Sequence, residues 1–264
     1  MKRSAILHGT AALGAALCLT GAPLRAAEQP GVTVFAAASL REAFEAAAPA
    51  FTKQTGIKVT YSFGGSDMLV AQLKQGAPAD VFASANEAQM KVASDAGLLA
   101  EPGRTFVRNR LVVIVPKDNR AKIAAVGDLA KPGIKVVLAA AAVPVGTYAR
   151  TAFRKLNGAQ GYPADFAGAV ERNVVSDELD VKAVATKISL GEGDAGVVYA
   201  TDVTPSIASK VTAIQFPPGA APEAIYPIAP LKAAPNAAGA RAFVAFILSP
   251  AGQAFLRARG FAAP

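Results

Sequence analysis

Histidine and cysteine are nearly absent from this chain, which has one of each, His8 and Cys18. Both lie in residues 1–27, a segment that we expect to be removed from the mature protein. Without an imidazole or a thiol, the rest of the chain has no thiol nucleophile, no Ser-His-Asp triad and no zinc site built on those residues. Disulfides are excluded as well, but roughly 235 residues bury enough apolar surface to fold without them.

The N-terminal segment has the order of a secretory signal peptide. Two basic residues precede an apolar stretch over 5–19, and small residues follow near Ala26 and Ala27, where we expect cleavage. A membrane-spanning helix is the alternative, but the apolar stretch is short for one. Lipid attachment at Cys18 is disfavoured because Leu17 stands where lipoprotein signals carry a small residue.

Blocks of basic residues are also missing. The chain has 27 basic and 19 acidic side chains, and without Lys2, Arg3 and Arg25 the count is 24 against 19, a net charge of +5. The basic residues are scattered and are not interleaved with aromatics, so we expect no nucleic-acid partner. A mild positive field does speed the capture of anions.

Strand-like and helix-like runs alternate along the rest of the chain, which predicts an α/β architecture with mainly parallel sheets. Apolar residues at helical spacing predict the first helix over 40–51. Further helices are expected at 68–73, 90–99, 237–248 and 250–259. Strands are expected at 57–63, 80–83, 111–115, 134–138, 196–199 and 211–216.

The length is at the upper limit for one α/β domain. The apolar run Leu111–Val115 near the middle predicts a crossover between two lobes, with a return crossing near 224–230. We therefore expect one lobe over residues 28–110 and 226–264, and a second over 111–225. A ligand would then bind in the cleft between the lobes, where strand ends and helix starts converge.

Two serines occupy matching places. Ser39 closes the run 32–38 and Ser66 closes the run 59–65, each just before a helix-like stretch. A helix start has backbone N–H groups without intrahelical partners and the positive end of the helix dipole. Two such starts aimed at one point, each with a hydroxyl donor, predict a site for an oxyanion.

Five short segments then follow one another in a recognisable order. They are VFAAASL at 34–40, FGGS at 63–66, GAPADVFASA at 76–85, VPVGTYA at 143–149 and GVVY at 196–199. Together they resemble the periplasmic molybdate-binding proteins of ABC transporters, over nearly all of the mature chain. The resemblance implies a two-lobed periplasmic binding protein fold of type II, with the ligand cleft between lobes joined by two crossover strands.

The resemblance also implies a role and a site. The protein would be an exported periplasmic monomer, without a cofactor or enzymatic activity, that captures molybdate or tungstate and delivers it to a membrane permease. Ser39 and Ser66 would each donate a hydroxyl and a backbone N–H, Val145 and Val181 a backbone N–H, and Tyr199 its phenol O–H. These groups would contact the oxygens of the oxyanion and not the metal itself. Each charge-assisted hydrogen bond would contribute about 1.5 to 3 kcal/mol.

Simpler interpretations exist for single residues. Ser39 begins a Ser-Leu-Arg-Glu run and so fits a helix capping box with Glu42. Tyr199 alone fits a half-buried tyrosine at a strand end. From the sequence we expect Ser39→Ala and Ser66→Ala to cost affinity and to leave the stability of the free protein nearly unchanged.

Other functions remain open at this stage. The same fold could bind sulfate or an organic anion, which an arginine or an acceptor in the cleft would indicate; Arg150 is expected to point outside. An enzyme is the less favoured alternative, with Asp67 and Asp180 as the nearest acid–base candidates. Asp67 and the flexible pair Gly64-Gly65 depart from the family pattern, and an Asp67 carboxylate in the cleft would repel a dianion.

Overall fold

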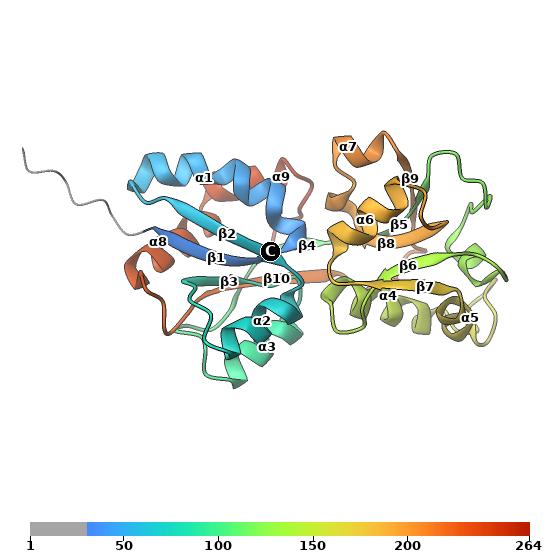
Figure 1. Ribbon diagram of the computed structural model, residues 1–264, viewed down its shortest axis with the longest axis horizontal. Helices are drawn as coiled ribbons and strands as arrows, with labels where there is room; N and C mark the ends of the chain where they lie inside the picture. Colours follow the sequence, from blue (N-terminus) through green and yellow to red (C-terminus); the bar gives the residue numbers. More distant parts are fainter. Residues whose placement is uncertain (1–30) are drawn as a thin grey trace, which may run out of the picture.

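The computed structural model describes residues 31–264, and the predicted signal peptide at 1–27 lies outside them. The strands form two separate five-stranded sheets, which lie side by side along the long axis of the molecule (Figure 1). We call each sheet with its helices a lobe. The predicted two-lobed α/β architecture is confirmed, and the division at residues 110 and 225 stays a proposal.

The first lobe has strand order β2-β1-β3-β10-β4. Its strands are β1 (Val32–Ala37), β2 (Val59–Gly64), β3 (Val81–Ala83), β4 (Arg104–Asn109) and β10 (Ala224–Pro230). Its helices are α1 (Arg41–Thr55), α2 (Ser66–Lys74), α3 (Glu87–Asp95), α8 (Ala237–Leu248) and α9 (Pro250–Arg257), with a 3-10 turn η1 (Ala38–Leu40). The strands β1, β2 and β3 are parallel, and β10 is antiparallel to both of its neighbours.

The second lobe has strand order β7-β6-β8-β5-β9. Its strands are β5 (Leu111–Pro116), β6 (Val136–Ala139), β7 (Val174–Glu178), β8 (Ala195–Tyr199) and β9 (Val211–Gln215). Its helices are α4 (Pro144–Lys155), α5 (Phe166–Arg172), α6 (Val181–Ser189) and α7 (Pro205–Ala208), with 3-10 turns η2 (Val126–Ala130) and η3 (Ala200–Asp202). Here β6 is parallel to β7 and β8, while β5 is antiparallel to β8 and β9.

The first sheet is covered on both faces because side chains alternate along its strands. Val34 and Ala36 of β1 belong to the core shared with α1 and α8, where Phe44 and Phe243 pack edge to face with ring centroids 5.6 Å apart. Phe35, between them, belongs to a second cluster with residues of α2 and α3. Each face thus has its own apolar layer, and together the two layers hold β1 in place.

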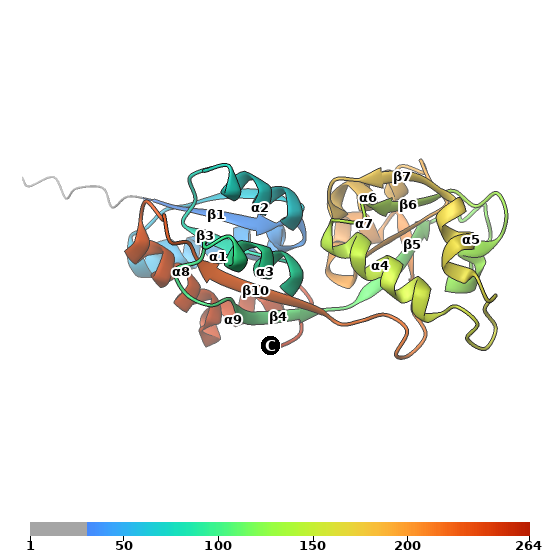
Figure 2. The ribbon, with the colours of Figure 1, turned by 90° about the horizontal axis from the view of Figure 1, so that it is seen from below.

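The connections between the lobes differ from the predicted ones. The run Leu111–Val115 does not cross between lobes, because it lies within β5, buried between β8 and β9. The chain crosses at Arg110, between β4 and β5, and returns between β9 and β10, as can be followed in Figure 2. A run that is apolar at every position is typical of a strand covered on both faces. A connection between lobes is exposed to solvent and would not need such a run.

Among residues 31–264, no single helix is long and apolar enough to span a membrane. Only α8 and α9 together reach the required length and hydropathy, and they are bent by 62°. Phe243 and Ile247 of α8 are buried in the core of the first lobe.

Candidate anion-binding site

The two serines lie at the ends of adjacent parallel strands. Strand register pairs Ala37 of β1 with Gly64 of β2, so the chain leaves both strands at the same edge of the sheet. Ser39 lies in η1 and Ser66 is the first residue of α2, with exposed fractions of 3% and 1%. The structure thus brings together the two helix starts that the sequence predicts.

Ser39 does not form the capping box that its sequence allows. The N-cap of α1 is Leu40, without a side-chain cap, and the Ser39 hydroxyl lies 2.9 Å from the Tyr226 phenol oxygen. The Ser66 hydroxyl accepts a hydrogen bond of 3.0 Å from the backbone N–H of Ala85. Neither serine side chain caps its own helix, so the O–H of each is available to donate to a ligand.

The start of α4 supplies the first donor of the second lobe. Pro144 occupies the first helical position and has no N–H, and the helix has no side-chain cap. The Thr147 N–H is bonded to the Val143 carbonyl oxygen at 2.9 Å, which leaves the Val145 N–H ahead of the helical ladder. The helix begins at Pro144, so Val145 is its second residue and lies in the first turn.

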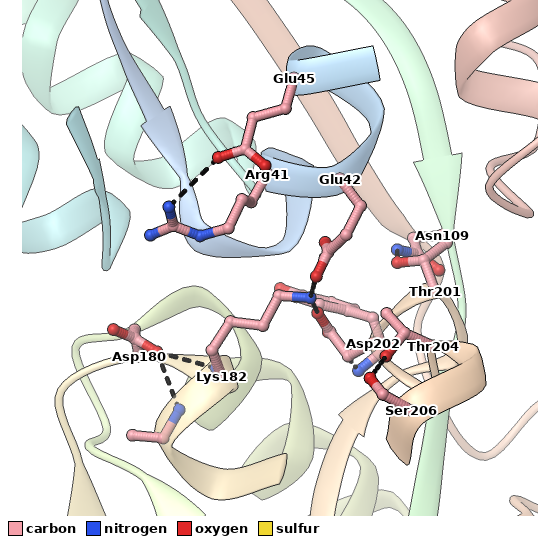
Figure 3. Close-up of polar contacts among 12 residues, drawn as sticks. Arg41, Glu42, Glu45, Asn109, Asp180, Lys182, Thr201, Asp202, Thr204 and Ser206 are labelled. Atoms are coloured by element: carbon pink, nitrogen blue, oxygen red, sulfur yellow. Dashed lines mark hydrogen bonds and ion pairs between the residues drawn. The ribbon is translucent and has the colours of Figure 1, made fainter. Parts of the chain in front are cut away.

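The start of α6 supplies the second donor. The Asp180 carboxylate is the N-cap and accepts the N–H groups of Lys182 and Ala183 at 2.8 and 3.0 Å. Val181 is the first residue of the helix, so its N–H has no intrahelical partner. Asp180, a candidate acid or base from the sequence, is therefore engaged in capping (Figure 3).

Tyr199, at the end of β8, offers a buried phenol. It is 1% exposed, and its hydroxyl has no hydrogen-bond partner within residues 31–264. Burial raises the pKa of Tyr199 well above the ordinary value of 10, so the group is neutral and keeps its proton. Tyr199 is thus fully buried and not half-buried as in the simpler interpretation, and its hydroxyl is a donor able to bond an acceptor in the cavity.

These elements enclose one cavity between the lobes. Ser39, Ser66, Val145, Val181 and Tyr199 all line it, and its volume of about 10 Å³ is that needed for about one water molecule. Larger hollows of about 400 and 420 Å³, near Lys117 and Leu73, do not combine groups from both lobes. A hollow of about 190 Å³ does combine them, between Ser39 and Thr201, but Ser66, Val145, Val181 and Tyr199 do not line it. The described residues contain no group of three or more His, Cys, Asp or Glu side chains able to hold a metal ion.

Charged side chains near the cavity are held away from its centre. Asp67 does not line the cavity; burial raises the pKa of its carboxyl, and the N–H groups of Asp67 and Met68 lower it. Arg150 binds the Ala139 carbonyl oxygen and Asp177, at 2.8 and 2.7 Å, outside the cavity as expected. Within residues 31–264, Asp180 is the one carboxylate that lines it, and it is turned to the N–H groups of α6.

An ion cluster joins the lobes next to the site, and no short sequence motif indicates it. Lys182 of α6 reaches across to Glu42 of α1, at 2.8 Å from both carboxylate oxygens, and lies 3.2 Å from an Asp202 oxygen (Figure 3). Asp202 is fully buried and also accepts the Tyr199 N–H. Burial raises the pKa of Asp202 to about 6, against the lowering effect of Lys182. The cluster therefore links α1, which follows Ser39, to α6, which begins at Val181, and to η3, which follows Tyr199.

Known proteins resemble the chain over most of its length. The profile of the family described as bacterial extracellular solute-binding protein matches residues 32–262. The molybdate-binding protein ModA of Mycobacterium tuberculosis is 41% identical over 234 residues, covering 88% of this chain and 85% of that protein. ModA of Escherichia coli is 32% identical over 255 residues, covering 94% and 95%.

One solved structure extends the comparison. The substrate binding domain of a putative molybdenum ABC transporter from Clostridium difficile has a TM-score of 0.64 and 29% identity, and the match covers 89% of this chain and 99% of that chain. Sequence and fold therefore agree over both lobes. This chain belongs to the bacterial extracellular solute-binding protein family and, within it, to the relatives of the molybdate-binding protein ModA.

Proposed function

We propose that this protein captures molybdate, and tungstate as a close analogue, in the cavity between its lobes and delivers it to the permease of an ABC transporter. The observation that carries the proposal is the single cavity lined by Ser39, Ser66, Val145, Val181 and Tyr199. Each offers a neutral hydrogen-bond donor, and no lysine or arginine lines the cavity. The relatives named above, which are molybdate-binding proteins, support the choice of ligand.

The chemistry of the donors favours a proton-free tetrahedral dianion. Molybdate and tungstate have no proton at neutral pH, so each oxygen accepts hydrogen bonds and none needs an acceptor from the protein. Two helix starts from the second lobe add the positive ends of their dipoles. Sulfate is also proton-free, so its exclusion must come from its shorter bonds and poorer fit to the closed cavity.

The anion favours closure of the lobes because its hydrogen-bond donors come from both of them. Ser39 and Ser66 come from the first lobe, and Val145, Val181 and Tyr199 from the second, so the anion gains its full set of bonds only when the lobes meet. A ligand shifts an equilibrium by its differential affinity for the two states, and this division provides that difference. A permease that recognises the closed form would then select the loaded protein.

The remaining parts of the proposal concern the whole protein. Residues 1–27 act as a cleavable signal peptide, and the mature monomer works in the periplasm as a binding protein without cofactor or catalytic activity. The first lobe comprises residues 28–110 and 226–264, and the second 111–225. The membership in the solute-binding protein family supports this role.

Calorimetric titration of the mature, dialysed protein tests the ligand. Molybdate and tungstate, but not sulfate or phosphate, are expected to bind one to one. Preference for sulfate, or no heat with any of the four anions, would leave the fold in place and reject the ligand.

Single substitutions test the site by the same titration. Ser39→Ala and Ser66→Ala are each expected to weaken molybdate binding by about 10- to 150-fold, the equivalent of one charge-assisted hydrogen bond. Ser206→Ala, in the exposed α7, is the matched control and should leave the affinity unchanged. A serine whose loss leaves the affinity unaltered does not belong to the site.

A further inference from the structure

Two strands of the first lobe that adjoin the connections between the lobes, β4 and β10, place polar side chains behind Ser39. Asn109 is the last residue of β4 and Tyr226 lies in β10, where the two strands pair. The Tyr226 phenol oxygen lies 2.9 Å from the Ser39 hydroxyl oxygen and 3.4 Å from Asn109 Nδ2. All three side chains are buried. Neither Asn109 nor Tyr226 lines the cavity, so any influence on the anion passes through Ser39.

The orientation of the Asn109 amide fixes the first proton. The Arg110 backbone N–H donates to Asn109 Oδ1 at 2.9 Å, which leaves Nδ2 facing Tyr226 and also Thr201 Oγ1, at 2.8 Å. An amide nitrogen only donates. Of the two groups within hydrogen-bond distance of the Tyr226 hydroxyl, Ser39 Oγ is therefore the one that can accept its proton. Burial raises the pKa of Tyr226, and the Tyr199 hydroxyl, which forms no hydrogen bond of ordinary geometry within residues 31–264, acts on Tyr226 as a donor and lowers that pKa.

The Ser39 hydroxyl consequently has one of its two lone pairs engaged by Tyr226 and its own proton free for the cavity. Ser66 is in the same state, because its oxygen accepts the Ala85 N–H. Tyr199 adds a hydroxyl with no partner in the described part of the chain. The hydroxyl groups of the site are thus oriented to donate.

Resting on the proposed function, we propose that Tyr226, held by Asn109, is a positioning residue that keeps the Ser39 hydroxyl pointed at the anion and thereby determines selectivity against oxyanions that carry a proton. Hydrogen phosphate brings an O–H for which no hydroxyl lone pair is turned to the anion, and the one lining carboxylate, Asp180, is directed at the N–H groups of α6. Without the Tyr226 proton, a lone pair of Ser39 becomes available, and Ser39 can rotate to accept that O–H. This rotation weakens the binding of molybdate, which needs a donor, and strengthens the binding of hydrogen phosphate, which needs an acceptor.

The test compares dissociation constants for molybdate and inorganic phosphate at slightly alkaline pH by calorimetry. Tyr226→Phe is expected to weaken molybdate binding about tenfold and to lower the ratio of phosphate to molybdate dissociation constants by at least that factor. In a Ser39→Ala background, Tyr226→Phe should change molybdate binding less than about twofold, because the residue acts through Ser39. Equal weakening of both anions, unchanged molybdate binding, or full additivity with Ser39→Ala would each overturn the proposal.

Tyr61→Phe is the matched control. Its phenol is part-buried in the same lobe and donates to the Phe44 carbonyl oxygen at 2.9 Å, away from the cavity, so its loss should leave the ratio unchanged. Thermal unfolding establishes that each variant is folded.

If Tyr226→Phe does not fold, Asn109→Asp gives a second test. It replaces the donor by an acceptor that takes the Tyr226 proton, and the added charge repels both anions, so the ratio should again fall; an unchanged ratio contradicts the proposal. A wild-type protein that fails to bind molybdate rejects the proposed function itself, whereas wild-type binding with an unchanged ratio in the variants rejects only this inference.

Discussion

Gly146 sets the position of the α4 start that carries Val145. A Cβ atom at Gly146 would lie 2.2 Å from the Ala140 carbonyl oxygen and 2.3 Å from that of Ala139, and both are backbone atoms that cannot move aside. The glycine is therefore required by close approach of the chain and not by its own dihedral angles. In the sequence, Gly146 is part of the segment VPVGTYA at 143–149, but the sequence does not show that close packing requires a glycine there.

Gly146→Ala is expected to destabilise the fold by about 1 to 3 kcal/mol, or more, through overpacking, and to weaken molybdate binding by displacing the Val145 N–H. Thermal unfolding and calorimetric titration measure the two effects. Gly127→Ala is the control, since its nearest neighbour would be a Tyr162 ring carbon at 3.7 Å. Equal behaviour of the two variants would show that α4 adjusts freely.

The serine substitutions also need a revised expectation for stability. Ser66→Ala leaves the buried Ala85 N–H without its acceptor, and Ser39→Ala does the same to the Tyr226 hydroxyl proton. Each is now expected to lower the free energy of unfolding of the free protein by about 1 to 3 kcal/mol, instead of leaving it nearly unchanged. Denaturant titration without anion measures this, and variants as stable as the wild type would support the original expectation.

At the scale of elements, the sequence located most helices and strands, but it missed the helices α5 and α7, took β10 for a connection between the lobes, and missed the strands β4 and β7. Both are edge strands, and β7 is half-exposed with Ser176, Asp177 and Glu178 in its second half. Their apolar pattern is weak because neighbours cover them incompletely, and their pairing is decided by the adjacent strand. The helices α1 and α8 were predicted because a buried face repeats along each of them.

Asp202, in the cluster that joins α1, α6 and η3, gives the stability a pH dependence. Its pKa is raised from 3.8 to about 6 by burial, so the folded state binds an extra proton between these values. The contribution of Asp202 to the free energy of unfolding therefore falls as the pH rises through this interval. Asp202→Asn removes the effect, and the variant should gain stability relative to the wild type between about pH 4 and pH 7.

Denaturant titrations at several pH values measure that difference. Asp128→Asn is the opposite control, because a hydrogen bond from Lys131 lowers the pKa of Asp128, and this variant should lose stability relative to the wild type as the pH rises. A difference between Asp202→Asn and the wild type that stays constant with pH would contradict the assignment.

At the scale of the whole molecule, the lobes meet at few, specific points. Besides the Lys182–Glu42 ion pair, Gln89 of the first lobe donates to the Ala142 carbonyl oxygen of the second at 3.3 Å. A Cβ atom at Gly65 would lie 2.6 Å from the Leu179 carbonyl oxygen across the cleft. Gly65 has ordinary dihedral angles, φ −61° and ψ 135°, so no special turn requires it. The same Cβ atom would also lie 2.7 Å from Asp67 Oδ1, but this is the end of a flexible side chain, whereas the Leu179 carbonyl is backbone.

Gly65→Ala is expected to fold normally and to oppose full closure, weakening molybdate binding by about 5- to 150-fold if the clash costs 1 to 3 kcal/mol. Gly127→Ala is the control, because Gly127 does not line the cavity and its nearest contact would be Tyr162 Cε1 at 3.7 Å within the same lobe. Calorimetry gives the affinities, and small-angle scattering with molybdate measures closure. Equal affinities for the two variants would show that the lobes do not need this contact.

The sequence by itself determined the α/β class, most elements, the two helix starts at Ser39 and Ser66, and the family resemblance, because these depend on local periodicity and on residues close in the chain. Tertiary structure decided which groups face the anion and which hold them. Lys182 and Glu42 are 140 residues apart, and Ser39 and Tyr226 are 187 apart. Such contacts, the close approach of Gly65 to Leu179 and the burial of Asp202 arise only when two sheets pack and two lobes meet, which no local pattern encodes.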